Sequence, residues 1–154
     1  MTIKSAQKIQ FIILFISMLF LSACSADKPN RIYEQASNYN FFDTLMNLDI
    51  AISEHNYRII HRSNIGQAVR DRGEQKYPLS TVISFCNITY AKEMMEINSS
   101  LINDMPCIVT VREEASGVVV GTKLMTINTN NQKQNEFADR INANLKSIVE
   151  ATIE

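Results

Sequence analysis

The chain has 154 residues, with 15 Lys and Arg against 16 Asp and Glu and a formal net charge of −1. This length suits one domain with a single hydrophobic core. The charges form neither a basic stripe nor a run of like sign, so nucleic-acid binding is not expected.

The first 23 residues have the organisation of a secretory signal peptide. Lys4 and Lys8 are the only charged residues before Cys24, and residues 9–21 are almost wholly apolar. This apolar run is short for a membrane span, which needs about 20 residues. A positive start, a short apolar run and small residues before a cleavage site are typical of exported proteins. We therefore expect residues 1–23 to be removed, which takes the net charge from −1 to −3.

Residues 21–24 (Leu-Ser-Ala-Cys) resemble the lipobox of bacterial lipoproteins, in which the cysteine is acylated. The resemblance implies that Cys24 carries several acyl chains, enough for stable anchoring. Residues 24–30 would form a lipidated tether, and residues 31–154 the domain. Ser25 stands where a retention signal would place Asp, which favours the outer membrane, facing the periplasm, over the inner membrane. The alternatives are an ordinary cleaved signal with a chance cysteine, or an uncleaved anchor.

The domain is expected to begin with an edge strand within residues 31–39. Asn40 then caps a helix, whose core face follows the helical repeat and consists of Phe41, Leu45, Leu48 and Ile52. Asn56 is suited to the left-handed conformation that ends helices. Residues 57–62 are predicted to form the next strand.

A short helix is predicted from residue 63 or 64 to residue 72, ended by Gly73. Residues 79–86 alternate in the manner of a half-buried strand. Asn87 is predicted to cap the following helix, with an inward face of Ile88, Ala91 and Met95.

A loop ending at Met105-Pro106 leads to the last elements. Residues 107–113 are rich in β-branched side chains, Ser116-Gly117 marks a hairpin turn, and residues 118–125 form the partner strand. A long C-terminal helix then presents one apolar face, made of Phe137, Ile141, Leu145, Ile148 and Thr152.

This order of elements predicts a single small α+β domain. The sheet would have about five strands in a mixed or antiparallel arrangement, with the helices packed on one face. A sheet this small has a second face to cover, which favours a homodimer.

Short landmarks along the chain resemble the prokaryotic family called domain of unknown function 302. They are Asn56-Tyr57-Arg58-Ile59, Ser84-Phe85-Cys86-Asn87, Met105-Pro106-Cys107 and Gly117-Val118-Val119-Val120, and the likeness covers about residues 32–153. Three positions depart from the family pattern: Ile88 replaces a frequent Pro, Met105 a frequent Leu, and Asn56 a usual Gly. The family has no agreed activity, so the resemblance implies a fold and no reaction.

With Cys24 acylated, two of the three cysteines remain, Cys86 and Cys107. In an oxidising periplasm, two such cysteines are first interpreted as one disulfide. Cys86 ends one predicted strand and Cys107 begins the next. If the two strands are antiparallel, both cysteines lie at the same end of the sheet and can meet. If they are parallel, a strand length of about 23 Å separates them, beyond the disulfide limit of about 7 Å between Cα atoms.

Three interpretations of this cysteine pair remain open. The first is a structural disulfide or two buried thiols. The second is a ligand-binding pocket for an anion or a small apolar molecule, formed by Cys86, Asn87, Met105, Pro106 and Cys107. The third is redox or metal chemistry, although no Cys-x-x-Cys motif is present.

No catalytic constellation or phosphate loop appears in the sequence. His55 and His61 are expected to be structural, and we predict no metal site and no cofactor besides the lipid on Cys24. The sequence therefore favours a membrane-anchored, non-enzymatic module that binds an unknown small ligand or acts as an accessory protein. One alternative is a thiol-dependent redox, cofactor-carrying or metal-carrying protein using Cys86 and Cys107, and another is a purely structural envelope protein.

Overall fold

The computed structural model describes residues 31–154. The expected signal peptide, the lipidated Cys24 and the tether lie outside the described residues. The elements follow the chain in the order β1 (Ile32–Ser37), α2 (Phe41–Glu54), β2 (Arg58–Ser63), α3 (Ile65–Arg70), β3 (Ser80–Cys86), α4 (Ile88–Ile97), the 3-10 helix η1 (Ser99–Asp104), β4 (Cys107–Glu114), β5 (Gly117–Lys123) and α5 (Gln132–Ile153).

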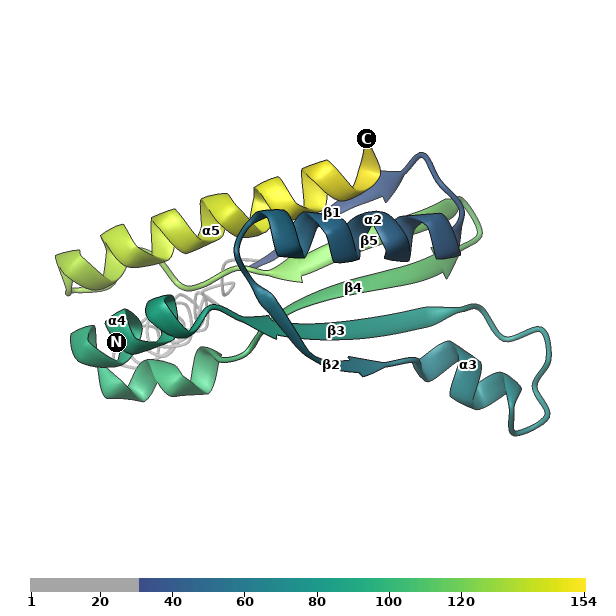
Figure 1. Cartoon of the computed structure of the whole chain (residues 1–154), viewed down its shortest axis with the longest axis horizontal. Coiled ribbons are helices and arrows are strands. Elements are labelled where there is room, and N and C mark those ends of the chain that lie inside the picture. Colours follow the sequence, from purple (N-terminus) through teal and green to yellow (C-terminus); the bar gives the residue numbers. More distant parts are fainter. Residues whose placement is uncertain (1–30) are drawn as a thin grey trace, which may run out of the picture. The chain divides into compact units, whose positions relative to one another are not determined.

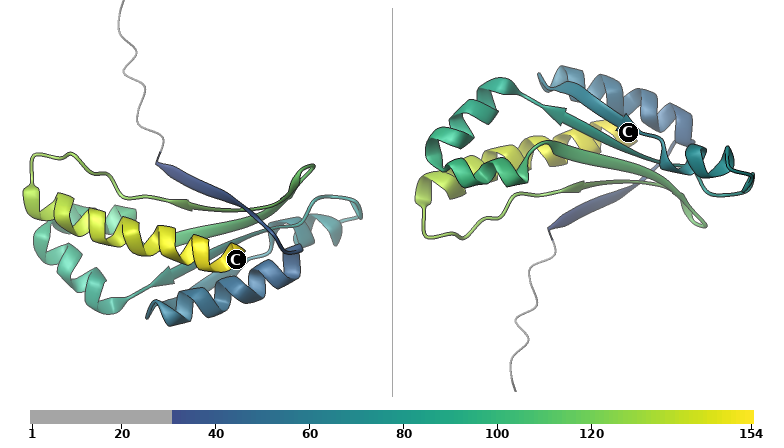
Figure 2. Two further views of the ribbon diagram at one scale, coloured as in Figure 1. Left: turned by 90° about the horizontal axis from the view of Figure 1, so that it is seen from above. Right: turned by 90° about the horizontal axis from the view of Figure 1, so that it is seen from below.

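The five strands form one sheet in the order β1-β5-β4-β3-β2, and every neighbouring pair is antiparallel. The two longest helices, α2 and α5, lie side by side on one face of this sheet (Figures 1 and 2). The predicted α+β class, with about five strands and helices on one face, is therefore confirmed.

Asparagines mark the start and the end of α2, as their side-chain chemistry predicts. The side chain of Asn40 accepts hydrogen bonds from the backbone N–H groups of Phe42 and Asp43 and so caps α2. Asn56 follows α2 with a φ of 61°, the left-handed conformation that turns the chain into β2.

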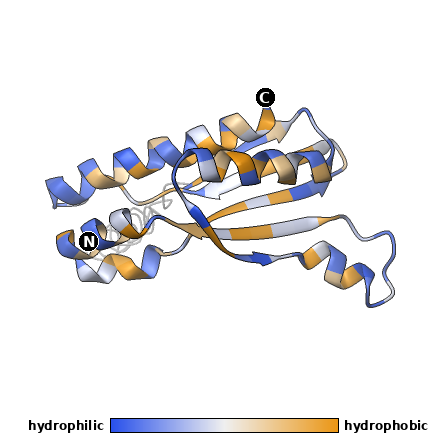
Figure 3. Ribbon diagram, viewed as in Figure 1, coloured by the Kyte–Doolittle hydropathy of each residue, from blue (hydrophilic) through white to orange (hydrophobic). Residues whose placement is uncertain are grey.

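The core lies between the sheet and the helices α2 and α5. In β3, Thr81, Ile83 and Phe85 are buried while the alternate residues are only half-buried, so the predicted period of two is confirmed. The predicted inward face of α5 is buried over its whole length. Figure 3 shows that the hydrophilic part of α5 is its N-terminal end, the end nearer α4.

Two local predictions between β3 and β4 are wrong. The inward face of α4 consists of Ala91 and Met94, whereas Ile88 is 83 % and Met95 36 % exposed. The difference arises because α4 packs against η1 and α5 rather than against the sheet. The segment predicted as a loop contains η1, whose start is capped by the side chain of Asn98.

The second face of the sheet carries half-exposed side chains, including Val82, Ile108 and Val119. No helix within residues 31–154 covers them (Figure 2). The homodimer expected from this open face stays a prediction. Over the same residues, no helix combines the length and apolar character needed to cross a bilayer.

Candidate functional site

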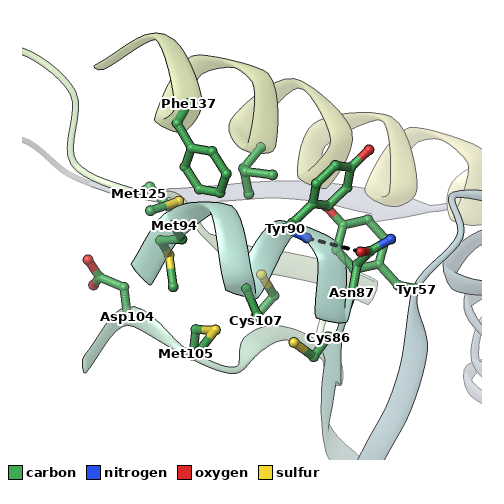
Figure 4. A pocket seen from close by; sticks show the side chains of 12 residues that line it. Tyr57, Cys86, Asn87, Tyr90, Met94, Asp104, Met105, Cys107, Met125 and Phe137 are labelled. Atoms are coloured by element: carbon green, nitrogen blue, oxygen red, sulfur yellow. Dashed lines mark hydrogen bonds between the residues drawn. The ribbon is translucent and has the colours of Figure 1, made fainter. Parts of the chain in front are cut away.

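A small cavity lies at the end of the sheet where β3 ends and β4 begins. Figure 4 shows the side chains around it, which come from β3, α4, η1, β4, α5 and the turns between them. The lining residues are Tyr57, Cys86, Asn87, Tyr90, Ala91, Met94, Asp104, Met105, Cys107, Met125, Phe137 and Ile141. The site therefore gathers residues that are far apart in the sequence.

The cavity measures about 30 Å³. That volume holds a water molecule or a single ion. Pockets for drug-sized organic molecules are larger, at roughly 300–1,000 Å³. The size of the cavity therefore favours a very small ligand.

Strand direction brings the two cysteines together. Strands β3 and β4 are antiparallel, and Phe85 is the register partner of Cys107. Cys86 is the next residue along β3, so both cysteines lie at the same end of the sheet and both line the cavity. Each is a free thiol in this structure.

Burial makes both thiols weak acids. Desolvation, with a smaller contribution from the nearby Cys86, raises the pKa of Cys107 to about 11. Desolvation also raises the pKa of Cys86. Both groups are therefore protonated near neutral pH, and a protonated thiol is a poor nucleophile.

The side-chain amide of Asn87 makes hydrogen bonds to backbone groups at the start of α4 and before β2. Its oxygen accepts hydrogen bonds from the backbone N–H groups of Thr89 and Tyr90, and its nitrogen donates to the backbone oxygen of Asn56 at 2.8 Å. Asn87 thus caps α4 and ties it to the turn before β2. Because its own side chain satisfies these N–H groups, the predicted anion-binding role of this corner finds little support.

We expect Asn87→Ala to lower the free energy of unfolding by about 1–2 kcal/mol, because the α4 cap and the bond to Asn56 are both lost. Chemical denaturation monitored by circular dichroism measures the change. Asn87→Asp keeps the capping oxygen and should recover part of the loss. A stability of Asn87→Ala equal to that of the wild type would contradict this role.

Of the five residues predicted to bind a ligand, four line the cavity: Cys86, Asn87, Met105 and Cys107. Pro106 is exposed and is not a lining residue. The peptide bond between Met105 and Pro106 is cis.

Two further methionines of the cavity, Met94 and Met125, are not among the site residues predicted from the sequence. Met94 belongs to the inward face of α4 and Met125 follows β5, and both are buried. The side chain of Asn142 holds Met125 in place: its oxygen accepts from the Met125 N–H at 2.7 Å, and its nitrogen donates to the Met125 carbonyl oxygen at 3.1 Å. Nothing in the sequence distinguishes these methionines from ordinary core residues.

Aromatic rings form much of the remaining wall. Tyr57 packs edge to face on Phe85, with ring centroids 5.3 Å apart, and also contacts Tyr90 at 5.8 Å. The Arg140 guanidinium lies over Tyr90 and Phe137, 5.8 and 5.3 Å from their centroids. Burial raises the pKa of Tyr57 to about 12, so its hydroxyl stays neutral.

The two histidines lie outside this site. His55 ends α2, with Nδ1 2.7 Å from the Ala51 carbonyl oxygen and Nε2 3.0 Å from the Ser147 hydroxyl. His61 Nε2 is 2.9 Å from the hydroxyl of Ser63. Within residues 31–154, no three His, Cys, Asp or Glu side chains come together as a metal-binding group.

Comparisons with known proteins agree with this fold. The chain matches the family described as "Domain of unknown function DUF302" over residues 33–152. Its structure resembles an uncharacterized conserved DUF302 protein from Bacillus stearothermophilus, with a TM-score of 0.71 and 15 % sequence identity. The match covers 80 % of this chain and 98 % of the Bacillus chain. No curated protein matches the sequence.

Proposed function

Because the chain belongs to the DUF302 family, whose description names no activity, we propose a function from the cavity itself: the domain is a non-enzymatic module that binds one very small ligand there. The observation that carries this proposal is a mostly apolar cavity with two free thiols in its wall. We further propose that the lipid on Cys24 holds this module at the bacterial membrane, facing the periplasm.

Native mass spectrometry of the full-length mature lipoprotein, extracted from cell envelopes in mild detergent, tests the binding role. We expect an additional bound mass on the wild-type chain. Ala91 lines the cavity, so Ala91→Leu should fill the space and lose that mass. Ala68→Leu, on the exposed side of α3, is the matched control and should keep it. A wild-type protein without bound mass, or a folded Ala91→Leu variant that retains it, would contradict the proposal.

The anchor has its own test. We expect Cys24→Ser to prevent both the acylation and the cut after Ala23 that depends on it, so intact mass should show the uncut chain without lipid. Cys86→Ser should still be acylated, cut and found in the membrane fraction. A Cys24→Ser product that is cut after Ala23 and still bound to membranes would show that the lipoprotein assignment is wrong.

A thiol redox role is the second candidate, since Cys86 and Cys107 lie at the same end of the sheet as free thiols. Their raised pKa values weigh against it, because redox-active cysteines generally have lowered pKa values. Counting free thiols before and after mild reduction separates the two functions. A disulfide that forms and breaks readily would favour the redox role.

A further inference from the structure

Sulfur-bearing side chains form a large part of the cavity wall. Five of its side chains carry sulfur: Cys86, Cys107, Met94, Met105 and Met125. They come from the end of β3, the start of β4, the inward face of α4, the end of η1 and the segment after β5. Figure 4 shows these sulfur-bearing side chains grouped around a common space.

We propose that the cavity is a site for one copper(I) ion, bound by the thiolates of Cys86 and Cys107 and the thioether of Met105. This inference rests on the proposed binding function and names its ligand. Met105 and Cys107 flank the exposed Pro106, so one short segment supplies two of the three ligands. Met94 and Met125 complete a thioether wall around them.

The choice of metal follows from the donor atoms. Thiolate and thioether sulfurs are soft ligands that select Cu(I), whereas carboxylate, carbonyl and water oxygens suit Mg²⁺, Ca²⁺ and Mn²⁺. Zinc sites use cysteine, histidine and carboxylate ligands, and a wall with three methionines offers zinc little. The volume of about 30 Å³ suits a bare ion without its hydration shell.

The surroundings suit a desolvated ion of low charge. Tyr57, Tyr90 and Phe137 provide an apolar shell that limits water access. Asp104 also lines the cavity, but its carboxylate lies 3.7 Å from the Arg31 guanidinium in an ion pair.

Copper(I) gains sulfur ligands from the protein on binding, and no electron is transferred. The copper arrives as Cu(I) and remains Cu(I). A bond forms from the metal to each cysteine sulfur as that sulfur loses its proton to solvent, and the thioether donates a lone pair. No oxidant or reductant is consumed.

The test uses the full-length mature lipoprotein in detergent, reduced and kept free of oxygen. Cu(I) is titrated in competition with a coloured Cu(I) chelator, and Ag(I) serves as a probe that does not change oxidation state. We expect one Cu(I) per chain and only sulfur neighbours in the copper X-ray absorption spectrum. Loss of an outer-shell partner already weakens a metal site by about 10–100-fold. Cys86→Ser and Cys107→Ser should therefore each weaken binding at least about 100-fold.

A methionine variant provides a second test of the site if a cysteine variant fails to fold. Met105→Leu preserves size and apolar character but removes the thioether, and should weaken Cu(I) and Ag(I) binding about 10–100-fold. Met95→Leu, on the exposed side of α4, is the matched control and should bind like the wild type. Circular dichroism confirms that both variants are folded.

The outcomes separate this inference from the function on which it rests. If the native protein carries a bound mass but does not bind Cu(I) or Ag(I), the copper assignment is overturned and the binding function stands. If neither a bound mass nor a metal is found, both are overturned. Oxygen or nitrogen neighbours around the copper, or unchanged affinity in a folded Met105→Leu variant, would also overturn the proposed ligand set.

Discussion

Asn142→Ala is expected to lower the free energy of unfolding by about 3 kcal/mol. Asn142 is only 8 % exposed, and its amide makes two hydrogen bonds to the backbone of Met125. The substitution leaves the N–H and the carbonyl oxygen of Met125 without these partners in a buried place. Each unsatisfied group costs about 1–3 kcal/mol, and this cost exceeds the small gain in helix propensity from alanine.

Urea denaturation of the wild type and the variant measures this loss. Asn144→Ala, two residues further along α5, is the matched control, because the Asn144 side chain donates a long hydrogen bond of 3.4 Å to the Tyr57 hydroxyl. It should change stability by less than about 1 kcal/mol. If Asn142→Ala were no worse than Asn144→Ala, the Met125 backbone would not depend on Asn142. Because Met125 lines the cavity, we also expect Asn142→Ala to weaken ligand binding.

Gly66→Ala is expected to lower the free energy of unfolding, although replacing glycine by alanine usually stabilises a helix. Alanine normally stabilises a helix interior by about 1 kcal/mol relative to glycine. At Gly66 in α3, however, a Cβ atom would lie 2.5 Å from both the Pro78 carbonyl oxygen and the Ser80 nitrogen, and 2.7 Å from the Leu79 Cα. All three are backbone atoms, so relief requires α3 to move away from β3. We expect a net loss of about 2 kcal/mol, within the usual range for overpacking.

The same denaturation experiment measures the Gly66→Ala change. Gln67→Ala is its control in the same helix: Gln67 is exposed and its side chain donates a hydrogen bond to the exposed Asp71 carboxylate, so the loss of stability should stay within about 0.5 kcal/mol. A Gly66→Ala variant as stable as the wild type would mean that α3 does not approach β3 this closely.

Features of the fold that depend on neighbours in sequence could be predicted from the sequence. The alternation in β3 and the caps at Asn40 and Asn87 depend on residues a few positions apart, and local physical chemistry determines them. The inward face of α4 could not be predicted in this way. Its apolar residues point in several directions, and packing against η1 and α5 selects Ala91 and Met94 over Ile88 and Met95.

The residues of the candidate site also divide into those that the sequence predicts and those that only tertiary packing reveals. Cys86 and Cys107 were identifiable because strand ends and loop landmarks mark them in the sequence. Met94 and Met125 were not, because a buried methionine in a helix or after a strand is indistinguishable from core until tertiary contacts are known. Pro106 is predicted as a site residue because its turn is expected beside Cys86, yet the chain turns it outward while its neighbours Met105 and Cys107 line the cavity.

The position of α4 and η1 beyond the ends of β3 and β4 (Figure 1) has a dynamic consequence. These two helices pack mainly on each other, and α4 also packs on α5, outside the hydrogen-bonded ladder of the sheet. Segments of this kind open by local unfolding at lower free energy than central strands. Backbone amides of α4 and η1 should therefore exchange with deuterium sooner than those of β3 and β4. A ligand could thus enter or leave by transient opening of this end while the five-stranded sheet stays folded.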